Sequence, residues 1–517
     1  MADAIVRSAG PPEQAGLRYG SGTGRWVVAA AVLGSGMASL DATVVAIALP
    51  TVGRQFHTGL ADLQWVVTAY TLTLAGLLLV GGGLGDRYGR RRVFVVGASW
   101  FALASLACGL APSARLLILA RALQGVGAAL LTPGSLAILQ ASFVPEDRPR
   151  AIGAWSGLSG VATAVGPFLG GWLITAVSWR LIFFINLPVA GAVIALSARH
   201  VPDSKDPAAT GRPDLLGAAL VTGGLVGLIF GLIQGPDLGW ASPPSLASLS
   251  CGAALLPAFV VAEAREAHPM LPPSIFRSRQ FSAANAVTFV VYGGLGGALF
   301  LLPIELQQVS GYTPLEAGVS LLPVTILMLA LSSRSGALAA RIGPRAQMAV
   351  GPLLAGVGLA LLARIGPSGA YLAQVLPGVA VLGLGLAITV APLTSTVLAA
   401  APGGHSGVAS AVNNDVARSA GLIAVAVLPV VAGITGTSYL HPAQFGAGFR
   451  VAVWAAAGAC GAGGIVAALT IRNPPRRHRH RPDRHLHCPL EAPPLRGGAS
   501  PHPLPSAGHV GGAPPPG

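Results

Sequence analysis

The chain has 517 residues, of which 53% are hydrophobic and 10% are charged, and its mean hydropathy is +0.67. This composition excludes a chain that folds in water, and about fourteen membrane spans of roughly twenty residues each would account for the apolar fraction. A net charge of +14 would suggest nucleic-acid binding in a soluble protein, so the distribution of the cations has to decide what the charge means.

Apolar runs long enough to cross a membrane recur along the chain. A polar N-terminal segment at 1–25 precedes a first group within 26–198, with runs at 26–48, 64–84, 93–112, 116–140, 151–176 and 181–198. A polar linker at 199–213 leads to two more runs within 214–263, at 214–234 and 245–263. A last group within 264–471 has runs at 281–304, 315–333, 346–364, 371–399, 408–433 and 449–471. The sequence therefore predicts an all-α polytopic membrane protein with two six-helix bundles and two extra central helices.

The cations lie mainly on one side of these predicted spans. With the N-terminus in the cytoplasm, 25 of the 32 Lys and Arg residues fall in cytoplasmic segments and five fall in the opposite loops. We expect a plasma-membrane protein, and the asymmetry predicts that both of its termini are cytoplasmic. The asymmetry also explains the positive charge without nucleic acid. The remaining two cations, Arg121 and Arg418, fall inside predicted spans.

Residues 472–517 are rich in Pro, Gly, Arg and His, and we expect them to form a disordered cytoplasmic tail. The tail contains a possible metal-binding tract made of His478, His480, His485, His487 and Cys488. Alternation with arginine in a flexible segment disfavours a preformed metal site, so contact with anionic lipid is the favoured interpretation and no metal is expected.

The first span carries a carboxylate, Asp41, within the sequence LDATVVAIALP at 40–50. Burial disfavours the charged form of an acid, so Asp41 could exchange a proton near neutral pH or pair with a cationic substrate. Pro50 lies only nine residues further on. The alternative is therefore an aspartate at a helix end that only caps the helix in a water-filled vestibule.

The fourth span carries Arg121, within the sequence LILARALQGVG at 117–127. A guanidinium in hydrocarbon needs a partner, and the candidates are carbonyls and carboxylates that face a central cavity, with Asp41 among them. Such a partner would favour the charged form of Asp41 and oppose the effect of burial. That opposition is what a proton-coupled switch requires.

The loop between the second and third spans reads GGLGDRYGRRRVF at 82–94, and it resembles the pattern G-x-L-a-D-r-x-G-r-k of the major facilitator superfamily. The matching positions are Gly82, Asp86, Arg87, Gly89, Arg90 and Arg91. The resemblance implies a cytoplasmic gate in which the aspartate pairs with an arginine or a helix N-terminus. The alternative, an arginine cluster that only holds the loop inside, is compatible with this role.

The fifth span resembles the pattern g-x8-G-x3-G-P-x2-G-G that is associated with antiporters of this superfamily. The matching residues are Gly153, Gly166, Pro167, Gly170 and Gly171, and Ala162 replaces one glycine. Glycines allow neighbouring helices to approach closely, and a Gly-Pro pair loosens the helix locally. The alternative is ordinary packing of small residues in a membrane.

Three further blocks resemble the fourteen-span drug:proton antiporters, at 178–188, 306–318 and 407–418. The resemblance covers 26–471, and GALAARIGPR at 336–345 repeats the gate motif with Ala340 in place of Asp86. One departure is Ala46, where the family usually has asparagine. Asp415 and Arg418 lie three residues apart, which favours a structural pair over a second coupling site.

The resemblance implies a proton-coupled antiporter that exports hydrophobic or cationic small molecules by alternating access. Asp41, Arg121, Asp415 and Arg418 are then the candidate coupling and substrate residues, and the proton gradient replaces any cofactor. We expect a monomer in the lipid membrane and no enzymatic activity, because no soluble segment carries a nucleophile, a base and a third group in a plausible array. The alternatives are a proton-coupled symporter for uptake and a non-transporting sensor.

Overall fold

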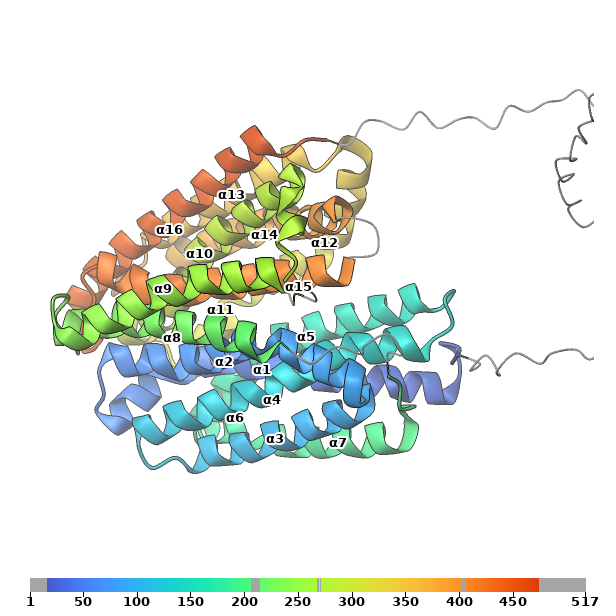
Figure 1. Ribbon diagram of the computed structural model, residues 1–517. Helices are drawn as coiled ribbons and strands as arrows, with labels where there is room; N and C mark the ends of the chain where they lie inside the picture. Colours follow the sequence, from blue (N-terminus) through green and yellow to red (C-terminus); the bar gives the residue numbers. More distant parts are fainter. Residues whose placement is uncertain (1–15, 206–213, 267–268, 270, 402–405, 474–517) are drawn as a thin grey trace, which may run out of the picture. The chain divides into compact units, whose positions relative to one another are not determined.

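The computed structural model describes residues 16–205, 214–266, 269, 271–401 and 406–473, and these residues form helices joined by short loops (Figure 1). Over this part of the chain there is no β-strand, and a single isolated bridge joins Leu17 to Phe143. Fourteen helical segments are long and apolar enough to cross a membrane. The predicted all-α polytopic fold is confirmed.

Seven helices precede the linker and the rest follow it. The first group is α1 (Gly22–Phe56), α2 (Leu60–Tyr88), α3 (Arg90–Leu110), α4 (Ala114–Ser142), α5 (Arg148–Ala176), α6 (Leu181–Phe184) and α7 (Asn186–His200). The two extra helices are α8 (Leu215–Leu238) and α9 (Pro243–Arg265). The last group is η1 (Pro273–Arg277), α10 (Arg279–Gln308), α11 (Pro314–Ser320), α12 (Leu322–Ile342), α13 (Arg345–Leu362), η2 (Tyr371–Val375), α14 (Leu376–Ala400), α15 (Ser406–Val431), η3 (Ser438–Leu440) and α16 (Pro442–Thr470).

Each group packs into a bundle of its own. In the N-terminal half, α4 packs against α2 and α3, and α1 packs against α5 and α7. In the C-terminal half, α13 packs against α14 and α16, and α10 packs against α15 and α16. Helix α8 packs against α9 and also reaches α2 and α15, so the extra pair contacts both halves. Contacts of α5 with α11, of α1 with α10 and of α2 with α15 join the two halves.

Local sequence signals set several helix ends. The Ser21 hydroxyl accepts a hydrogen bond from the Gly24 amide at 3.0 Å and caps α1. Thr313 and Glu316 form a reciprocal capping box at the start of α11. Gly89 and Gly343 end α2 and α12 with φ of +113° and +91°, a conformation that other residues rarely adopt.

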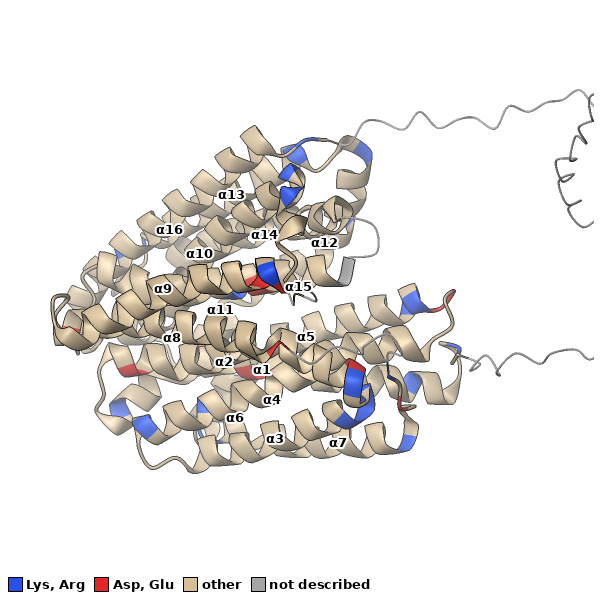
Figure 2. Ribbon diagram, in the orientation of Figure 1, with Lys and Arg blue, Asp and Glu red and all other residues tan. Residues whose placement is uncertain are grey.

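Charged residues lie mostly toward the ends of the helices, and the long middle stretches are nearly free of them (Figure 2). The buried core is built from Val, Leu, Ile, Ala and Phe. One hydrophobic cluster lies wholly within the N-terminal half, and a larger one includes Val44–Val52 of α1 together with residues of the C-terminal half. The second part of α1 therefore belongs to the contact between the halves.

Most helices begin or end a few residues away from the predicted runs, and three of these differences change the interpretation of a segment. The first span was expected to end at residue 48, but α1 continues through Pro50 to Phe56, since a proline is tolerated where the surrounding helices bury it. The N-terminal segment was expected to reach residue 25, but α1 begins at Gly22. The tail was expected to begin at residue 472, yet Arg472 exchanges two hydrogen bonds with Gln280 and Asn473 is bonded as well. The linker and tail residues at 206–213 and 474–517 lie outside the described residues.

Candidate functional site

Asp41 lies in the middle of α1 and has no exposed surface. Its carboxylate pairs with Arg121 of α4 and accepts hydrogen bonds from Gln124 Nε2 at 2.8 Å and Asn186 Nδ2 at 3.0 Å. The alternative of a capping aspartate at a helix end is therefore wrong, because α1 extends fifteen residues beyond Asp41. Asp41 is instead the centre of a buried polar cluster.

Arg121, with 1% of its surface exposed, is surrounded by acceptors. Besides Asp41, its Nε donates to the Val66 carbonyl at 3.0 Å, its Nη1 donates to Gln124 Oε1 at 2.6 Å, and its guanidinium lies 4.3 Å from the centre of the Tyr70 ring. The predicted contact between Asp41 and Arg121 is thus present in this conformation. A buried charge without such partners would cost several kcal/mol, and this cluster is balanced within one bundle.

Sequence reasoning did not single out two members of this cluster, Gln124 and Asn186. Gln124 also donates to Ser105 Oγ at 2.8 Å, and Asn186 donates to the same hydroxyl at 3.3 Å. Both residues stand inside motif blocks noted from the sequence, and each is an amide in an otherwise apolar run. That amide is the signal that could have identified them, since a buried amide needs partners.

Asp415 and Arg418 both lie on α15, but no ion pair within 4 Å joins these two described residues. Asp415 Oδ1 is buried without a hydrogen-bond partner. The favoured interpretation as a self-satisfied pair is therefore wrong for this conformation. Of the four candidate residues, Asp41 and Arg121 form an ion pair, and Asp415 and Arg418 do not.

The gate motif joins α2 and α3 to the segment that follows α7. Arg90 Nη2 lies 2.8 Å from Asp86 Oδ1, as the motif predicted, and Arg92 Nε lies 3.1 Å from Asp203 Oδ2. Arg91 Nη1 donates to the Val201 carbonyl at 3.3 Å. These contacts all remain within the N-terminal half. Gly82 packs loosely near Pro133, and Arg87 lies over the Tyr88 ring.

The second copy of the gate motif has the same geometry with neutral partners. Asn473 Oδ1 accepts from the Arg345 amide at 3.0 Å, and Asn473 Nδ2 donates to the Ile342 carbonyl at 3.4 Å. Gly343 would bring a side-chain carbon within 2.3 Å of Asn473, as Gly89 would within 2.7 Å of Asp203. In both halves, the segment after the last helix of the bundle holds this loop.

The glycines of the fifth span differ in what they contact. A side chain at Gly166 would meet Thr43 at 2.2 Å, and one at Gly170 would meet Val44 at 2.6 Å, so both glycines face α1. A side chain at Gly171 would lie 2.5 Å from the Pro314 carbonyl oxygen of α11. Gly153, by contrast, has nothing within 4 Å of such a side chain.

The same helix is held on its other side by a glycine of the C-terminal half. A side chain at Gly318 of α11 would lie only 2.1 Å from the carbonyl oxygen of Pro167. Backbone atoms cannot yield as side chains do, so this approach requires glycine. The motif therefore packs α5 between α1 of its own half and α11 of the other.

Every hydrogen bond between the two halves of the described chain lies at the end where α1 ends and α2 begins. Gln307 Nε2 donates to the Ile47 carbonyl at 2.9 Å, and Gln64 Nε2 donates to the Val425 carbonyl at 2.6 Å. The Leu60 amide donates to the Gly436 carbonyl at 2.8 Å. We call this end the closed end.

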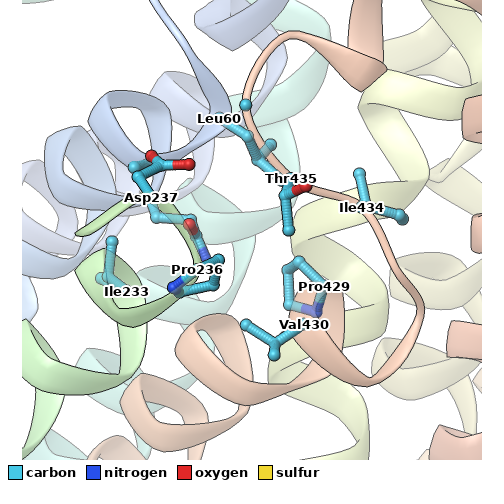
Figure 3. A pocket seen from close by; sticks show the side chains of 11 residues that line it. Leu60, Ile233, Pro236, Asp237, Pro429, Val430, Ile434 and Thr435 are labelled. Atoms are coloured by element: carbon cyan, nitrogen blue, oxygen red, sulfur yellow. The ribbon is translucent and has the colours of Figure 1, made fainter. Parts of the chain in front are cut away.

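A fourth bond between the halves at the closed end comes from the Tyr439 hydroxyl, which donates to the Thr58 carbonyl at 2.7 Å. Burial raises the pKa of Tyr439, so its phenol stays a donor at alkaline pH. Residues of α2, α8, the end of α15 and the loop after α15 surround a cavity of about 10 Å³ there (Figure 3). That volume is about the size of one water molecule, so the closed end leaves no passage for a ligand at this point.

Within the described residues, no group of three His, Cys, Asp or Glu side chains is arranged to hold a metal ion. The His and Cys tract of the tail lies outside them. The described residues show a buried ion pair and a closed contact between two helical bundles.

The family model for the Major Facilitator Superfamily matches residues 31–426, which is most of the chain. The chain belongs to the major facilitator superfamily. This membership confirms the resemblance and makes the protein a multi-pass membrane protein of a transporter family.

Relatives within the superfamily cover most of the chain. It is 36% identical over 403 residues to the tetracenomycin C resistance and export protein of Streptomyces glaucescens, with 78% of this chain and 74% of the relative covered. It is 35% identical over 446 residues to the methylenomycin A resistance protein of Bacillus subtilis, covering 84% and 92%. The multidrug resistance protein Stp of Mycobacterium tuberculosis is 36% identical over 412 residues, covering 79% and 76%.

Solved structures support the same fold. An auto-inhibited peptide transporter of the POT family superimposes with a TM-score of 0.64 over 88% of this chain and 98% of that chain. The POT family transporter PepTSo superimposes with a TM-score of 0.62 over 86% and 97%. Both are 16% identical to this chain, so they support the superfamily fold alone.

Proposed function

We propose that this protein is a proton-coupled antiporter that exports hydrophobic or cationic small molecules across the plasma membrane by alternating access. The observation that carries the proposal is the group of relatives named for antibiotic resistance or export, which match this chain over about three quarters of its length or more. The fourteen apolar helices support transport across a membrane.

The geometry supports a role for the buried polar cluster in coupling. The polar cluster of Asp41 and Arg121 has almost no exposed surface, and α5 packs between α1 and α11 beside it. In the proposed cycle, a substrate and a proton compete for this cluster, because a proton on Asp41 weakens its pairing with Arg121. One pH unit contributes ~1.4 kcal/mol per proton and 100 mV contributes ~2.3 kcal/mol per charge, so one or two protons sustain a substantial gradient.

The proposal places both termini in the cytoplasm, which makes the closed end the outer end and the described conformation closed toward the outside. The excess of arginine in the loops at the other end supports this orientation. The proposed transporter works as a monomer and is driven by the proton gradient without a cofactor.

The test is expression in a host that lacks its own efflux pumps, with a panel of lipophilic cationic dyes and antibiotics. We expect lower accumulation of at least one compound, full accumulation after addition of a protonophore, and no export by Asp41→Asn. Accumulation of a sugar or organic acid with protons, and no export of any compound, would establish the symporter instead. Export of a single scaffold would define a dedicated exporter rather than a multidrug transporter.

A further inference from the structure

Glu305 is a buried carboxylate that the proposed coupling cluster does not use. It lies near the end of α10, has no exposed surface, and neither of its carboxylate oxygens has a hydrogen-bond partner. Asp41 is equally buried but has three partners. The Glu305 carboxylate therefore has neither a hydrogen-bond partner nor an ion-pair partner in the described conformation.

The Glu305 carboxylate lies beside apolar residues of α10 and α16. Its Oε1 lies opposite Gly446 of α16, next to the side chain of Val309. The charged group whose field reaches Glu305 is Arg450, one turn beyond Gly446, and its side chain is exposed and forms no ion pair within 4 Å of the carboxylate. The other charged residues on elements packed against α10 are Arg25, Asp41 and Arg54 of α1, Arg277 of η1, Glu316 of α11, and Asp415 and Arg418 of α15. None of them forms an ion pair within 4 Å of Glu305.

An ionised glutamate in this place would be an isolated buried charge, which costs several kcal/mol even after relaxation. A neutral carboxylic acid is penalised much less. The described conformation is thus compatible with the protonated side chain and strongly disfavours the ionised one. Ionisation requires water or Arg450 to reach the carboxylate, and both lie toward the outer surface.

Glu305 is also mechanically tied to the closed end. Gln307, two residues further along α10, donates one of the hydrogen bonds that join the halves. The carbonyl of Glu305 accepts from the amides of Val309 at 2.9 Å and Ser310 at 3.2 Å, which fixes the last turn of α10. A movement of this turn that admits water to Glu305 would displace Gln307 from Ile47.

We propose that Glu305 is a proton-binding site that gates the closed end: this end closes only when the carboxylate carries a proton. A proton from the outer solution binds to the carboxylate oxygen as the end closes, and it leaves to the same solution when the end opens and the group is hydrated. This inference rests on the proposed orientation and adds to the proposed export a return step that external acidity favours.

The test measures the distance across the closed end in the full-length protein in lipid. Spin labels are placed at Leu110→Cys and Leu440→Cys, which are exposed positions at that end in the two halves. Cys251, which is exposed on α9, and Cys488, which lies in the tail, are replaced by serine. Cys108 and Cys460 are buried and remain. Electron paramagnetic resonance then gives the distance distribution as a function of pH, with no substrate present.

With Glu305 in place, we expect the short distance of the closed end at acidic pH and a growing population at longer distance as the pH rises. Glu305→Gln is neutral at every pH, so the short distance should persist throughout and the pH-dependent shift should be lost. Glu305→Asp keeps a titrating carboxyl and should retain the shift. Glu316→Gln, an exposed glutamate in the nearby capping box, should behave like the parent.

A shift of unchanged size in Glu305→Gln, or no shift in the parent, would overturn the proposal. If Glu305→Gln does not reach the membrane, Glu305→Met supplies a neutral side chain of similar length for the same comparison. The distance measurement needs no substrate, so it separates the two proposals. If Glu305→Gln loses the pH-dependent shift but the parent exports no dye, the gate is supported and the proposed export is rejected. If Glu305→Gln keeps the shift and the parent exports a dye, the export is supported and the gate is rejected.

Discussion

The two halves of the protein treat buried acids in opposite ways. In the N-terminal half, the carboxylate of Asp41 has a guanidinium and two amides around it. In the C-terminal half, Asp415 is half-buried and has one buried oxygen without a partner, and the buried Glu305 has two such oxygens. A buried negative charge is therefore stabilised by partners in the N-terminal bundle and lacks such partners in the C-terminal bundle, although both bundles are built from helices. The two halves therefore repeat the helical fold but not the arrangement of buried charges.

The gate loops repeat this contrast at the surface. The first copy is held by ion pairs from Asp86 and Asp203, and the second is held by the amide of Asn473 with Ala340 in place of an acid. Both loops nevertheless require the same kind of backbone conformation, because Gly89 and Gly343 both have positive φ. Geometry is thus shared between the copies and charge is not.

The largest expected effect comes from removing the cation of the balanced half. Arg121→Met leaves the carboxylate of Asp41 buried without its charged partner, and we expect a loss of roughly 3–5 kcal/mol in the free energy of unfolding. Denaturation of the purified protein in detergent measures it. Arg418→Met is the matched control, with a loss of about 1 kcal/mol or less because no ion pair is broken.

The double variant Asp41→Asn with Arg121→Met sharpens the result. Both charges are then absent, so the loss should be smaller than in Arg121→Met alone. Equal losses in Arg121→Met and Arg418→Met would mean that the closed ion pair contributes no more than the open one, and the contrast between the halves would fail.

The next effect should change sign between the halves. Asp41→Asn removes the charge that balances Arg121, and we expect a loss of about 2–3 kcal/mol together with loss of proton-driven export. Asp415→Asn removes a half-buried acid whose Oδ1 is buried without a partner, so stability should stay the same at acidic pH and rise at alkaline pH, where only the parent carries the unbalanced charge. Denaturation curves at two pH values measure both. Losses of similar size at both positions would contradict the contrast.

The fold followed from the sequence because its causes are local and repeated. Fourteen long apolar runs and the arginine asymmetry predict spans and sides without any knowledge of contacts. The ion pair of Asp41 with Arg121 was a reasonable expectation, because a lone acid and a lone base in hydrocarbon have few other partners.

The unpartnered acids could not be predicted in the same way. Asp415 and Arg418 are one helical turn apart, which suggested a pair, but side-chain direction within the bundle decides whether two such groups meet. Glu305 sits in a block that was noted from the residue after it onward, and nothing in the sequence says whether a glutamate near a helix end is buried. The role of Asn473 depends on a contact across 128 residues.

The backbone demand of the two gate loops predicts equal effects in the two halves. Gly89→Ala and Gly343→Ala each force a side chain into a conformation that almost only glycine adopts, and each meets a neighbouring side chain at under 3 Å. We expect losses of about 1–2 kcal/mol for both in the same denaturation assay. Gly458→Ala, in the interior of α16 with open space around it, should lose nothing. A large difference between Gly89→Ala and Gly343→Ala would show that charge, not geometry, holds the loops.

The smallest effect concerns the end of the C-terminal half, where a single amide replaces the ion pairs of the first gate loop. Removal of residues 474–517 should leave export unchanged, because the family resemblance ends before them and Asn473 is retained. Removal of Asn473 as well takes away its bonds to Arg345 and Ile342, and we expect a further loss of about 0.5–1.5 kcal/mol. Asn473→Asp is the matched substitution: it brings the carboxyl of the first copy to the second, keeps the bond from the Arg345 amide, and should retain most of the stability. Denaturation and dye export of the three variants at equal membrane levels measure these effects. Loss of export on removal of 474–517 alone would mean that the tail acts in transport and that the second gate loop depends on more than Asn473.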